Sequence, residues 1–587
     1  MKFNFFIFLS FVNSLIGQKE DYNWLIGYRG ATSGSNPLIS VCKMNFKNEN
    51  LKITRDSALI YYNQSNSIIS DRSGERILLT TNGFQLYNSI LNKLIPDCYI
   101  NIGSLSWSEV GGDVLKQGCI LLLTPGSLTK YRCLYLWMGE PKIDSFVQTN
   151  RFYEAIIDLN KNGGLGEIIS KDELIMAAPF EYGKITACRH ANGRDWWIIL
   201  PKRYSRDMYV FLFDPLGIRL HHTQTFNTIT HTGVGMAVFS PDGNHYAIAN
   251  TDGYDPICQG FVEVYDFDRC LGNLSNKREL FTLDSSCMRG LAFSPNSQFL
   301  YYNTMGVLYR LDINQPDLSS SKIIIDSIDG TLDPFLCAFG ASLLAPDHKI
   351  YIASEGGNRC MSVINYPDQT DPKLIGFDQN GIRLPSYNFK SIPNLPNFRL
   401  GPVDESSCDS LDIDNIPLAR FRFESDTTDY LKFQFVDLSN YNPTSWYWDF
   451  GDPNNPISSS SERNPNHRFS GNGVYTVCLT VKNNKGSNTQ CKSLTIGINK
   501  EDDLSTLASN IELFPNPFEE NFIVNVQDYF PSKLKLKLYN IHGNTLLEQA
   551  IQNGVNSIKS TNLKPGYYMY EIIEKSIVLK RGTCIRL

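Results

Sequence analysis

A repeat of about fifty residues is the feature that most constrains the fold of this chain. In each copy an apolar strand leads into a turn and then into a second strand rich in Tyr or Ile. The clearest copies are MAVFSPDGNHYAIAN from Met236, LAFSPNSQFLYYNT from Leu291 and SLLAPDHKIYIAS from Ser342. Their turn prolines, which are 54 and 51 residues apart, are Pro241, Pro295 and Pro346. This period exceeds that of helix-pair repeats and suits a four-stranded propeller blade.

Three weaker copies precede these, and they begin at Ser70, Leu123 and His190. Pro at the first central position and Asp or Asn before Gly favour a chain reversal, so each copy is predicted to be a hairpin corner. Asn394–Phe398 and residues 23–46 are expected to supply a seventh blade from both ends of the ring. Residues 20–403 then divide into seven units of about 55 residues. The sequence therefore predicts a seven-bladed β-propeller.

Several stretches of this region carry a family resemblance, and they are YEAIIDLNKNGGLGEI, ANGRDWWIILP, GMAVFSPDGNHYAIAN, VEVYDFDRCLG, LAFSPNSQFLYYNT and NLPNFRLGP. They resemble the N-terminal propeller of large secreted bacterial surface proteins that carry PKD domains. The resemblance covers most of residues 22–403.

Charge and cysteine content exclude several classes of protein. The chain has 54 Lys and Arg against 60 Asp and Glu, without a basic block, so nucleic acid is not an expected partner. Charged residues make up 19%, which is typical of a folded chain and not of a disordered one. The fourteen cysteines lack the CxxC spacing of zinc sites and suggest scattered disulfides. No cofactor and no metal site is expected.

The N-terminus predicts an exported protein. Lys2 precedes an apolar stretch from Phe3 to Ile16, and the chain turns polar after Gly17. This pattern is typical of a signal peptide over residues 1–17, whereas a membrane anchor needs about 20 apolar residues. No later segment is apolar enough to span a membrane, so no transmembrane segment is expected after cleavage.

Three features of the propeller region resemble ligand or catalytic sites: a calcium-loop pattern, the SPDG corners and a histidine pair. Asp158, Asn160, Asn162 and Gly163 match the first half of a calcium loop, but position 12 is Ile169, so a turn between strands is favoured. The SPDG corners lack the order of a sialidase Asp-box, and Asp242 is expected to cap its own turn. No pair of glycosidase carboxylates can be singled out.

The adjacent histidines His221 and His222 are expected to point to opposite faces of a strand. Such a pair cannot jointly hold a metal ion. They are interpreted as ordinary surface or packing residues.

A second module is predicted over residues 415–498, after a linker at 404–414. Its signature is SWYWDFGD, in which Trp448 and Phe450 face one side of a strand, Asp449 and Asp452 face the turn, and Gly451 permits the reversal. Trp448 is placed as the packing centre of a two-sheet sandwich in preference to a carbohydrate platform. The motif is similar to the PKD family of immunoglobulin-like domains, which implies a non-catalytic spacer or adhesive module.

A disulfide is predicted in this module. Cys478 and Cys491 flank a turn at 483–486, and pairing Lys482 with Ser487 places the two cysteines directly opposite each other. Opposed antiparallel residues have Cα atoms about 4.5 to 5.5 Å apart, within disulfide reach. The alternative is two buried thiols.

A linker at 499–510 leads to a last module at 511–587, also predicted to be a sandwich. Its motif residues are Pro515, Asn516, Pro517, Gly543, Leu563, Gly566 and Tyr568. They resemble the type A C-terminal sorting domain of the type IX secretion system of Gram-negative bacteria. The resemblance implies delivery to the outer-membrane translocon, followed by surface anchoring or release. The chain departs from the pattern after Lys580-Arg581, where Gly582–Leu587 follow.

Together these patterns predict an all-β chain in which a seven-bladed propeller is followed by two immunoglobulin-like sandwiches. The leading hypothesis is a non-enzymatic surface or extracellular protein whose propeller binds an extracellular ligand, a glycan or a protein. The alternative is a secreted hydrolase or lyase that acts on polysaccharide or peptide through the propeller channel. No nucleophile elbow or HExxH motif supports this alternative. A structural component of a sheath, matrix or adhesin is a third hypothesis.

Overall fold

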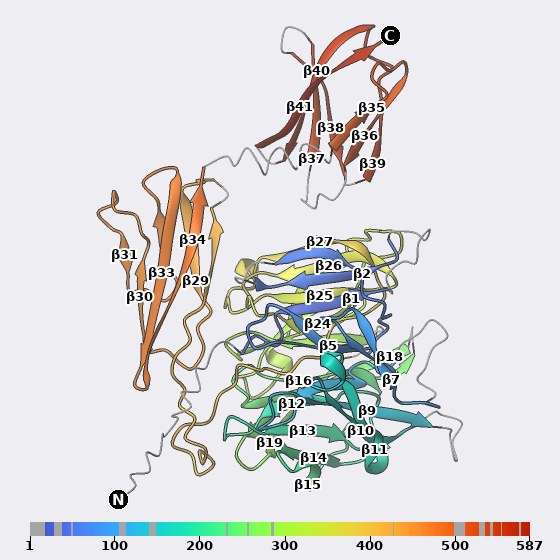
Figure 1. The fold of residues 1–587 in the computed structure, drawn as a ribbon, viewed down its shortest axis with the longest axis vertical. Coiled ribbons are helices and arrows are strands. Elements are labelled where there is room, and N and C mark those ends of the chain that lie inside the picture. Colours follow the sequence, from blue (N-terminus) through green and yellow to red (C-terminus); the bar gives the residue numbers. More distant parts are fainter. Residues whose placement is uncertain are drawn as a thin grey trace, which may run out of the picture.

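The computed structural model describes residues 18–28, 38–47, 51–104, 113–139, 148–230, 233–254, 257–282, 287–426, 428–497, 511–526, 534–540, 544–552, 554–574 and 577–587. The predicted signal peptide, the predicted linker at 499–510 and Gly543 lie outside these residues. Almost all regular structure of the described residues is β-strand, and it forms three bodies, shown in Figure 1: a large one in blue to yellow, then an orange and a red one.

The described residues of the large body form seven consecutive antiparallel sheets. The first sheet contains β1 (Asn23–Gly27), β2 (Val41–Asn45) and β3 (Lys52–Asp56). The second contains β4 (Ser67–Ser70), β5 (Ile77–Thr81), β6 (Gln85–Asn88) and β7 (Lys93–Tyr99). The third contains β8 (Cys119–Leu123), β9 (Lys130–Gly139), β10 (Gln148–Asp158) and β11 (Glu167–Phe180). The fourth and fifth are β12 (Thr186–Arg189), β13 (Trp196–Pro201), β14 (Asp207–Asp214) and β15 (Gly217–Thr225); and β16 (Val234–Phe239), β17 (His245–Tyr254), β18 (Ile257–Asp268) and β19 (Asn273–Thr282).

The sixth and seventh sheets are β20 (Met288–Phe293), β21 (Phe299–Thr304), β22 (Val307–Asp312) and β23 (Ile323–Ser327); and β24 (Ala338–Leu344), β25 (Ile350–Glu355), β26 (Asn358–Ile364) and β27 (Phe377–Asn388). The first strands of neighbouring sheets contact each other, as β16, β20 and β24 do, and β27 contacts β1 to β3 and closes the ring. Figure 1 shows β24 and β12 toward the middle of this body and β27 and β15 at its outside. The predicted propeller is confirmed, and we interpret each sheet as one blade.

Alternating apolar residues explain why the sheets pack face to face. One buried cluster joins the second, third and fourth sheets, and a second cluster joins the first sheet to the fifth, sixth and seventh. Trp24 of β1 contacts Tyr351 of β25 edge to face, with ring centroids 5.8 Å apart. Each blade thus buries both faces against its neighbours, which is how a propeller forms a core from separate sheets.

The orange body is a sandwich of two sheets. One sheet contains β28 (Phe421–Ser425), β29 (Lys432–Asp437) and β32 (Asn466–Arg468); the other contains β31 (Ser459–Ser460), β30 (Ser445–Asp449), β33 (Gly473–Asn483) and β34 (Gly486–Ile496). Trp448 is fully buried between the sheets, and its ring lies 5.1 Å from that of Phe421 and 5.5 Å from that of Phe435. The tryptophan is therefore the packing centre that the sequence predicts.

The red body is a second sandwich. One sheet contains β35 (Ile511–Phe514), β36 (Asn521–Val526) and β39 (Gly554–Lys559); the other contains β38 (Thr545–Ile551), β37 (Leu534–Tyr539), β40 (Gly566–Glu574) and β41 (Ile577–Arg586). The predicted all-β architecture, a propeller followed by two sandwiches, is confirmed. Within the described residues no helix is long and apolar enough to cross a membrane.

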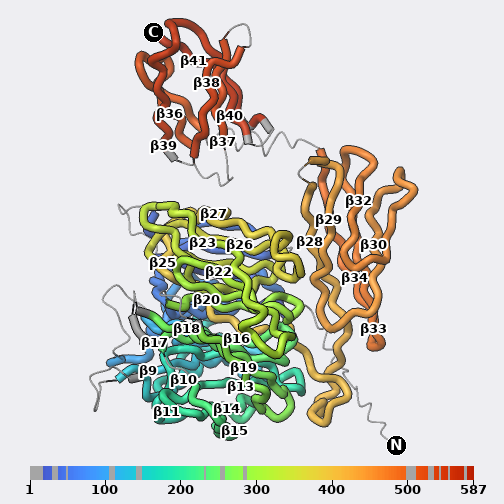
Figure 2. The backbone as a smooth tube through the Cα atoms, turned by 180° about the vertical axis from the view of Figure 1, so that it is seen from behind, coloured from blue at the N-terminus to red at the C-terminus, as the bar shows by residue number. Residues whose placement is uncertain are grey.

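The orange sandwich is docked against the propeller. Figure 2 shows β28 on the side of the sandwich that faces the propeller. Arg420 and Arg422 are almost completely buried there. Arg420 donates to the carbonyl of Pro346 at 3.1 Å, and Arg422 donates to the carbonyl of Asn365 at 3.0 Å. Arginines that lose their water need such acceptors, so these contacts hold the two bodies together.

Two further bonds join these bodies. Lys349 of the propeller pairs with Glu424 of β28 at 2.9 Å. Cys408, in the predicted linker at 404–414, forms a disulfide with Cys270, and their Cα atoms are 5.7 Å apart. The linker is therefore attached covalently to the fifth sheet.

Candidate functional site

The central channel of the propeller, which could hold a ligand, is occupied by a segment of the chain itself. Asn394 donates side-chain hydrogen bonds to the carbonyls of Cys119 at 2.9 Å and Ile185 at 2.8 Å. Its backbone N–H donates to Asn66 at 2.7 Å, and Ser67 donates to its carbonyl at 3.1 Å. One asparagine thus bonds to residues at the start of the inner strands β4, β8 and β12.

The same segment continues along the axis to the other end of the ring. Asn397 donates to the carbonyl of Pro241, in the turn after β16, at 2.7 Å. Phe398 contacts Trp196 edge to face at 5.8 Å. Leu395 packs against buried clusters from every part of the ring. Residues 392–398 therefore fill the channel from the beginning to the end of the inner strands.

The expectation that Asn394–Phe398 forms a strand of the seventh blade is wrong. The segment has no strand structure, and the first sheet has three strands among the described residues. Pro393 and Pro396 explain the difference, because proline has no N–H to donate to a ladder. The segment instead bonds through Asn side chains.

Charged groups lie at the end of the channel where the inner strands begin. Lys116 and Lys390 contact the two carboxylate oxygens of Glu355, each at 3.1 Å. Burial raises the pKa of Glu355, but the charges of Lys116, Lys390 and Arg289 outweigh burial and lower it to about 2. The carboxylate is thus held ionised between cations, which is the arrangement of a structural ion-pair network.

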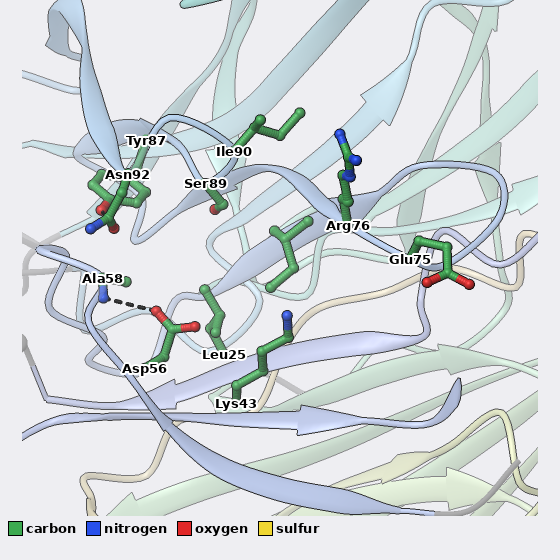
Figure 3. A pocket seen from close by; sticks show the side chains of 11 residues that line it. Leu25, Lys43, Asp56, Ala58, Glu75, Arg76, Tyr87, Ser89, Ile90 and Asn92 are labelled. Atoms are coloured by element: carbon green, nitrogen blue, oxygen red, sulfur yellow. Dashed lines mark hydrogen bonds between the residues drawn. The ribbon is translucent and has the colours of Figure 1, made fainter. Parts of the chain in front are cut away.

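A pocket of about 330 Å³ lies between the first and second sheets. Figure 3 shows the side chains that line it, which are Leu25, Lys43, Asp56, Ala58, Glu75, Arg76, Ile77, Tyr87, Ser89, Ile90 and Asn92. Asp56 accepts a hydrogen bond from the backbone N–H of Ala58 at 2.8 Å, and Glu75 pairs with Lys47 at 2.8 Å. This pocket combines an apolar floor with charged side chains. The sequence reasoning missed it.

The calcium-loop and Asp-box residues form turns. Asp158 ends β10 and accepts a hydrogen bond from the N–H of Asn160 at 3.0 Å, and a short 3-10 turn at Asn162–Gly164 leads to β11. Asp242 accepts from the N–H of Asn244 at 3.0 Å, and Gly243 has φ of 74°. These are the backbone-capping contacts that Asp makes in turns.

The prediction that His221 and His222 point to opposite faces is wrong. Val210 pairs with His222 but Phe211 pairs with Leu220, so a β-bulge inserts one extra residue at His221. The bulge breaks the alternation of the strand and turns the two rings together, with their Nδ1 atoms 2.8 Å apart. His221 also contacts Trp197 edge to face at 5.1 Å, which agrees with a packing role. The described residues contain no group of three or more metal ligands.

The WDFGD motif of the orange sandwich forms a turn over a buried carboxylate. Gly451 has φ of 61°, and a Cβ there would lie 2.4 Å from the carbonyl oxygen of Thr476, so glycine is required. Asp449 accepts from the N–H of Gly451 at 2.9 Å. Asp452 is buried and accepts from the N–H of Ser470 at 2.8 Å and from its hydroxyl at 2.6 Å.

His467 completes this arrangement. Its Nε2 lies 3.3 Å from Asp452 Oδ2, and its ring stacks on Phe450 with centroids 4.0 Å apart. Burial lowers the pKa of His467, against the charge of Asp452. Burial raises the pKa of Asp452, but the hydrogen bonds from Ser470 outweigh burial and leave the pKa below its usual value. The buried groups Asp452, His467 and Ser470 therefore bond to one another and support the turn.

The register of β33 and β34 places Cys478 directly opposite Cys491, as the sequence predicts, and also pairs Lys482 with Ser487. The sulfur atoms are bonded at 2.07 Å, and the Cα atoms are 4.0 Å apart. Two further disulfides join Cys258 to Cys287 and Cys337 to Cys360. Bonds of this kind are typical of exported proteins.

The proline-rich opening of the red sandwich holds the end of the chain. The Asn516 side chain donates to the carbonyl of Thr583 at 3.0 Å and accepts from the N–H of Ile585 at 2.9 Å. Pro515 and Pro517 flank it in the turn after β35. Asn516 thus fixes β41 against the other sheet.

The remaining described motif residues support the same sandwich. Leu563 and Tyr568 are buried, and the Tyr568 hydroxyl donates to the carbonyl of Lys564. Gly566 begins β40 with φ of 154°. The departure after Lys580-Arg581 also has a structural reason, because these residues complete β41 and Cys584 is fully buried in the core.

Comparison with known proteins agrees with the two sandwiches. The family model described as PKD domain matches residues 417–498, and the family model described as secretion system C-terminal sorting domain matches residues 512–585. The chain carries a PKD domain and a sorting domain. The sorting domain is the signal of the type IX secretion system, and the protein is therefore secreted or attached to the cell surface. None of the curated proteins compared with this chain matches it.

Three solved structures that match the chain do so at low sequence identity. A putative 6-phosphogluconolactonase from Bacteroides uniformis is 12% identical over 63% of this chain and 98% of its own, with a TM-score of 0.38. The β-propeller domain of Cps50 (Swd1) from Myceliophteria thermophila is 10% identical over 58% and 91%, with a TM-score of 0.33. Sqt1 from Chaetomium thermophilum is 12% identical over 82% and 98%, with a TM-score of 0.31. The sheets of this chain and the contacts between them define the propeller.

Proposed function

We propose that the protein is a non-enzymatic binding protein of the cell surface or the extracellular medium. In this proposal the outside of the propeller presents the ligand site, and the PKD domain is a spacer. The sorting domain brings both to the outer-membrane translocon. The observation that carries the proposal is the position of residues 392–398. They fill the channel through which a propeller hydrolase or lyase would admit its substrate.

The buried charges of the channel support the same proposal. Glu355 is held between Lys116 and Lys390, and its lowered pKa leaves no proton for general-acid chemistry at neutral pH. A catalytic carboxyl group has its pKa tuned toward the working pH, in the opposite direction. The group therefore suits structural closure of the channel.

The PKD domain contributes rigidity. Arg420, just before β28, and Arg422 and Glu424 of β28 bind it to the propeller. The preceding segment is bonded through Cys408. A spacer attached in this way keeps a binding face in one orientation and lowers the entropy lost when a ligand binds.

The proposal is tested with the purified exported chain on glycan arrays and labelled polysaccharides and peptides, with analysis of products. We expect saturable binding to one ligand class without new reducing ends or new peptide termini. Turnover of any polymer by the chain, retained after PKD domain removal, would overturn the proposal and favour the hydrolase or lyase alternative.

A further inference from the structure

Lys43 occupies a position where an apolar side chain would be expected. On β2 it shares a face with Val41, and it lies directly opposite Leu25 of β1. Leu25 and Val41 are buried in the cluster that joins the first and second sheets. A lysine at the next position of this face leaves the sheets apart at their edge, where the pocket between them opens. A cation placed at a gap between blades suggests a ligand of opposite charge.

Two cations of this pocket have no partner in the described part of the chain. Neither the Lys43 ammonium nor the Arg76 guanidinium makes an ion pair or side-chain hydrogen bond with a described residue, although Arg132 and Lys171 in the next sheet are paired. Glu75, an acidic residue at the rim of the pocket, forms an ion pair with Lys47 and not with either of these cations. Unpaired cations in one concave site attract an anion.

Hydroxyl-binding groups lie on both sides of the pocket, with Asp56 beside Lys43 and Ser89 across from it. Ser89 Oγ is buried without a hydrogen-bond partner. Asp56 Oδ1 accepts a hydrogen bond from the N–H of Ala58, and no described residue donates a hydrogen bond to Asp56 Oδ2. Figure 3 shows Lys43 and Asp56 on one side and Tyr87, Ser89 and Asn92 on the other. A ligand with hydroxyl groups would satisfy both Ser89 and Asp56.

We infer that this pocket binds an acidic sugar unit, a hydroxylated ring that carries a carboxylate or a sulfate. Lys43 and Arg76 bind the anionic group, Asp56 and Ser89 bind ring hydroxyls, and the apolar side chains of Leu25, Ala58 and Ile77 contact the carbon face of the ring. A volume of about 330 Å³ accommodates one sugar unit with the rest of a polymer outside. The inference rests on the proposed binding function and names the ligand class for it.

The test is calorimetric titration of the exported chain with glucuronate, glucose 6-sulfate, glucose and inorganic sulfate. We expect both anionic sugars to bind, and glucose to bind at least about tenfold more weakly because it lacks the charge. The comparison of glucuronate with glucose 6-sulfate shows which anionic group the pocket takes. Equal affinity for glucuronate and glucose, or no binding of either anionic sugar, would overturn the inference.

Three variants assign the binding to the pocket. The double variant Lys43→Gln/Arg76→Gln should weaken binding of the anionic sugars by about a hundredfold, roughly tenfold for each charge-assisted bond lost. Lys52→Gln, which removes a cation from the neighbouring strand β3 outside the pocket, should leave the affinity unchanged. Asp56→Asn should weaken the sugars but not inorganic sulfate, and equal loss for both would overturn the role given to the ring hydroxyls.

The two proposals fail in different ways. Polymer turnover would overturn the non-enzymatic function while leaving the effect of Lys43→Gln/Arg76→Gln intact. Glycan binding that is unchanged in this double variant would overturn the pocket while leaving the binding function intact. Thermal unfolding of each variant, with an unchanged midpoint, shows that a loss of affinity is not a loss of fold.

Discussion

Asn394 donates a hydrogen bond of 2.9 Å to the carbonyl oxygen of Cys119, which lies 275 residues earlier in the chain. A single amide on the axis thus holds together blades formed by distant parts of the sequence. The same side-chain nitrogen also donates to the carbonyl oxygen of Ile185 at 2.8 Å.

Replacing Asn394 with Ala should destabilise the propeller by about 2–5 kcal/mol, because two buried carbonyls lose their donor. Urea unfolding followed by tryptophan fluorescence measures the change. Asn397→Ala removes the bond to Pro241 and the local turn bond from the N–H of Arg399; it is the control and should cost about 1–2 kcal/mol. Equal effects of the two substitutions would show that Asn394 has no special role.

The PKD domain should lose stability as the pH falls. The pKa of His467 is lowered in the fold, so the unfolded chain binds more protons below about pH 6.5 and unfolding is favoured there. The pKa of Asp452 is also lowered, so its contribution is present above about pH 4 and is lost as the pH falls further. Thermal melts between pH 8 and pH 2 measure both effects, that of His467 in the upper part of the range and that of Asp452 below about pH 4.

His467→Phe is the informative variant for this pH dependence. Phenylalanine keeps the stack on Phe450 but cannot titrate, so the loss of stability between pH 7 and pH 5 should become smaller. A variant with the same pH profile as the wild type would contradict the role assigned to His467.

The Cys478–Cys491 disulfide should be detected by mass spectrometry of unreduced peptides from the exported protein. The double substitution to serine should destabilise the PKD domain by about 3 kcal/mol, the value expected for closing a short loop in the unfolded chain. Complete alkylation of both cysteines without prior reduction would rule the bond out.

Deletion of residues 511–587 should stop the protein in the periplasm. The propeller and the PKD domain have buried clusters of their own, so both should remain folded in the truncated chain. Cell fractionation with immunoblotting compares the truncated and full-length chains, and circular dichroism checks the fold. Wild-type amounts of truncated protein at the surface or in the medium would mean that the sorting domain is not needed for export.

Local patterns predicted the sandwiches well. Trp448, Phe450 and Gly451 are arranged as the alternation of one strand and one turn requires, and the Cys478–Cys491 register follows from counting residues around a single hairpin. These features depend on neighbours within about twenty residues of each other. Such short-range geometry can be read from a sequence.

The features that were missed depend on distant residues or on irregular backbone. The pocket at Lys43 exists because two sheets meet with a lysine at their edge, and no pattern within β2 alone shows what lies opposite. A β-bulge at His221 breaks the alternation on which the prediction relied. The sequence does contain a signal against a strand in the axial segment, because Pro393 and Pro396 have no N–H to donate to a ladder.

The Cys270–Cys408 disulfide determines the path of mechanical tension through a surface-held protein. Both the sixth and the seventh sheets and the axial segment lie between these two cysteines in sequence. Once the contacts of Arg420, Arg422 and Glu424 with the propeller give way, a pull on the PKD domain from its C-terminal side passes through the sulfur atoms into the fifth sheet and does not stretch the chain in between. Shear flow or a bound polymer would load β18 and its neighbours, while the hydrogen bonds of Asn394 stay unstrained.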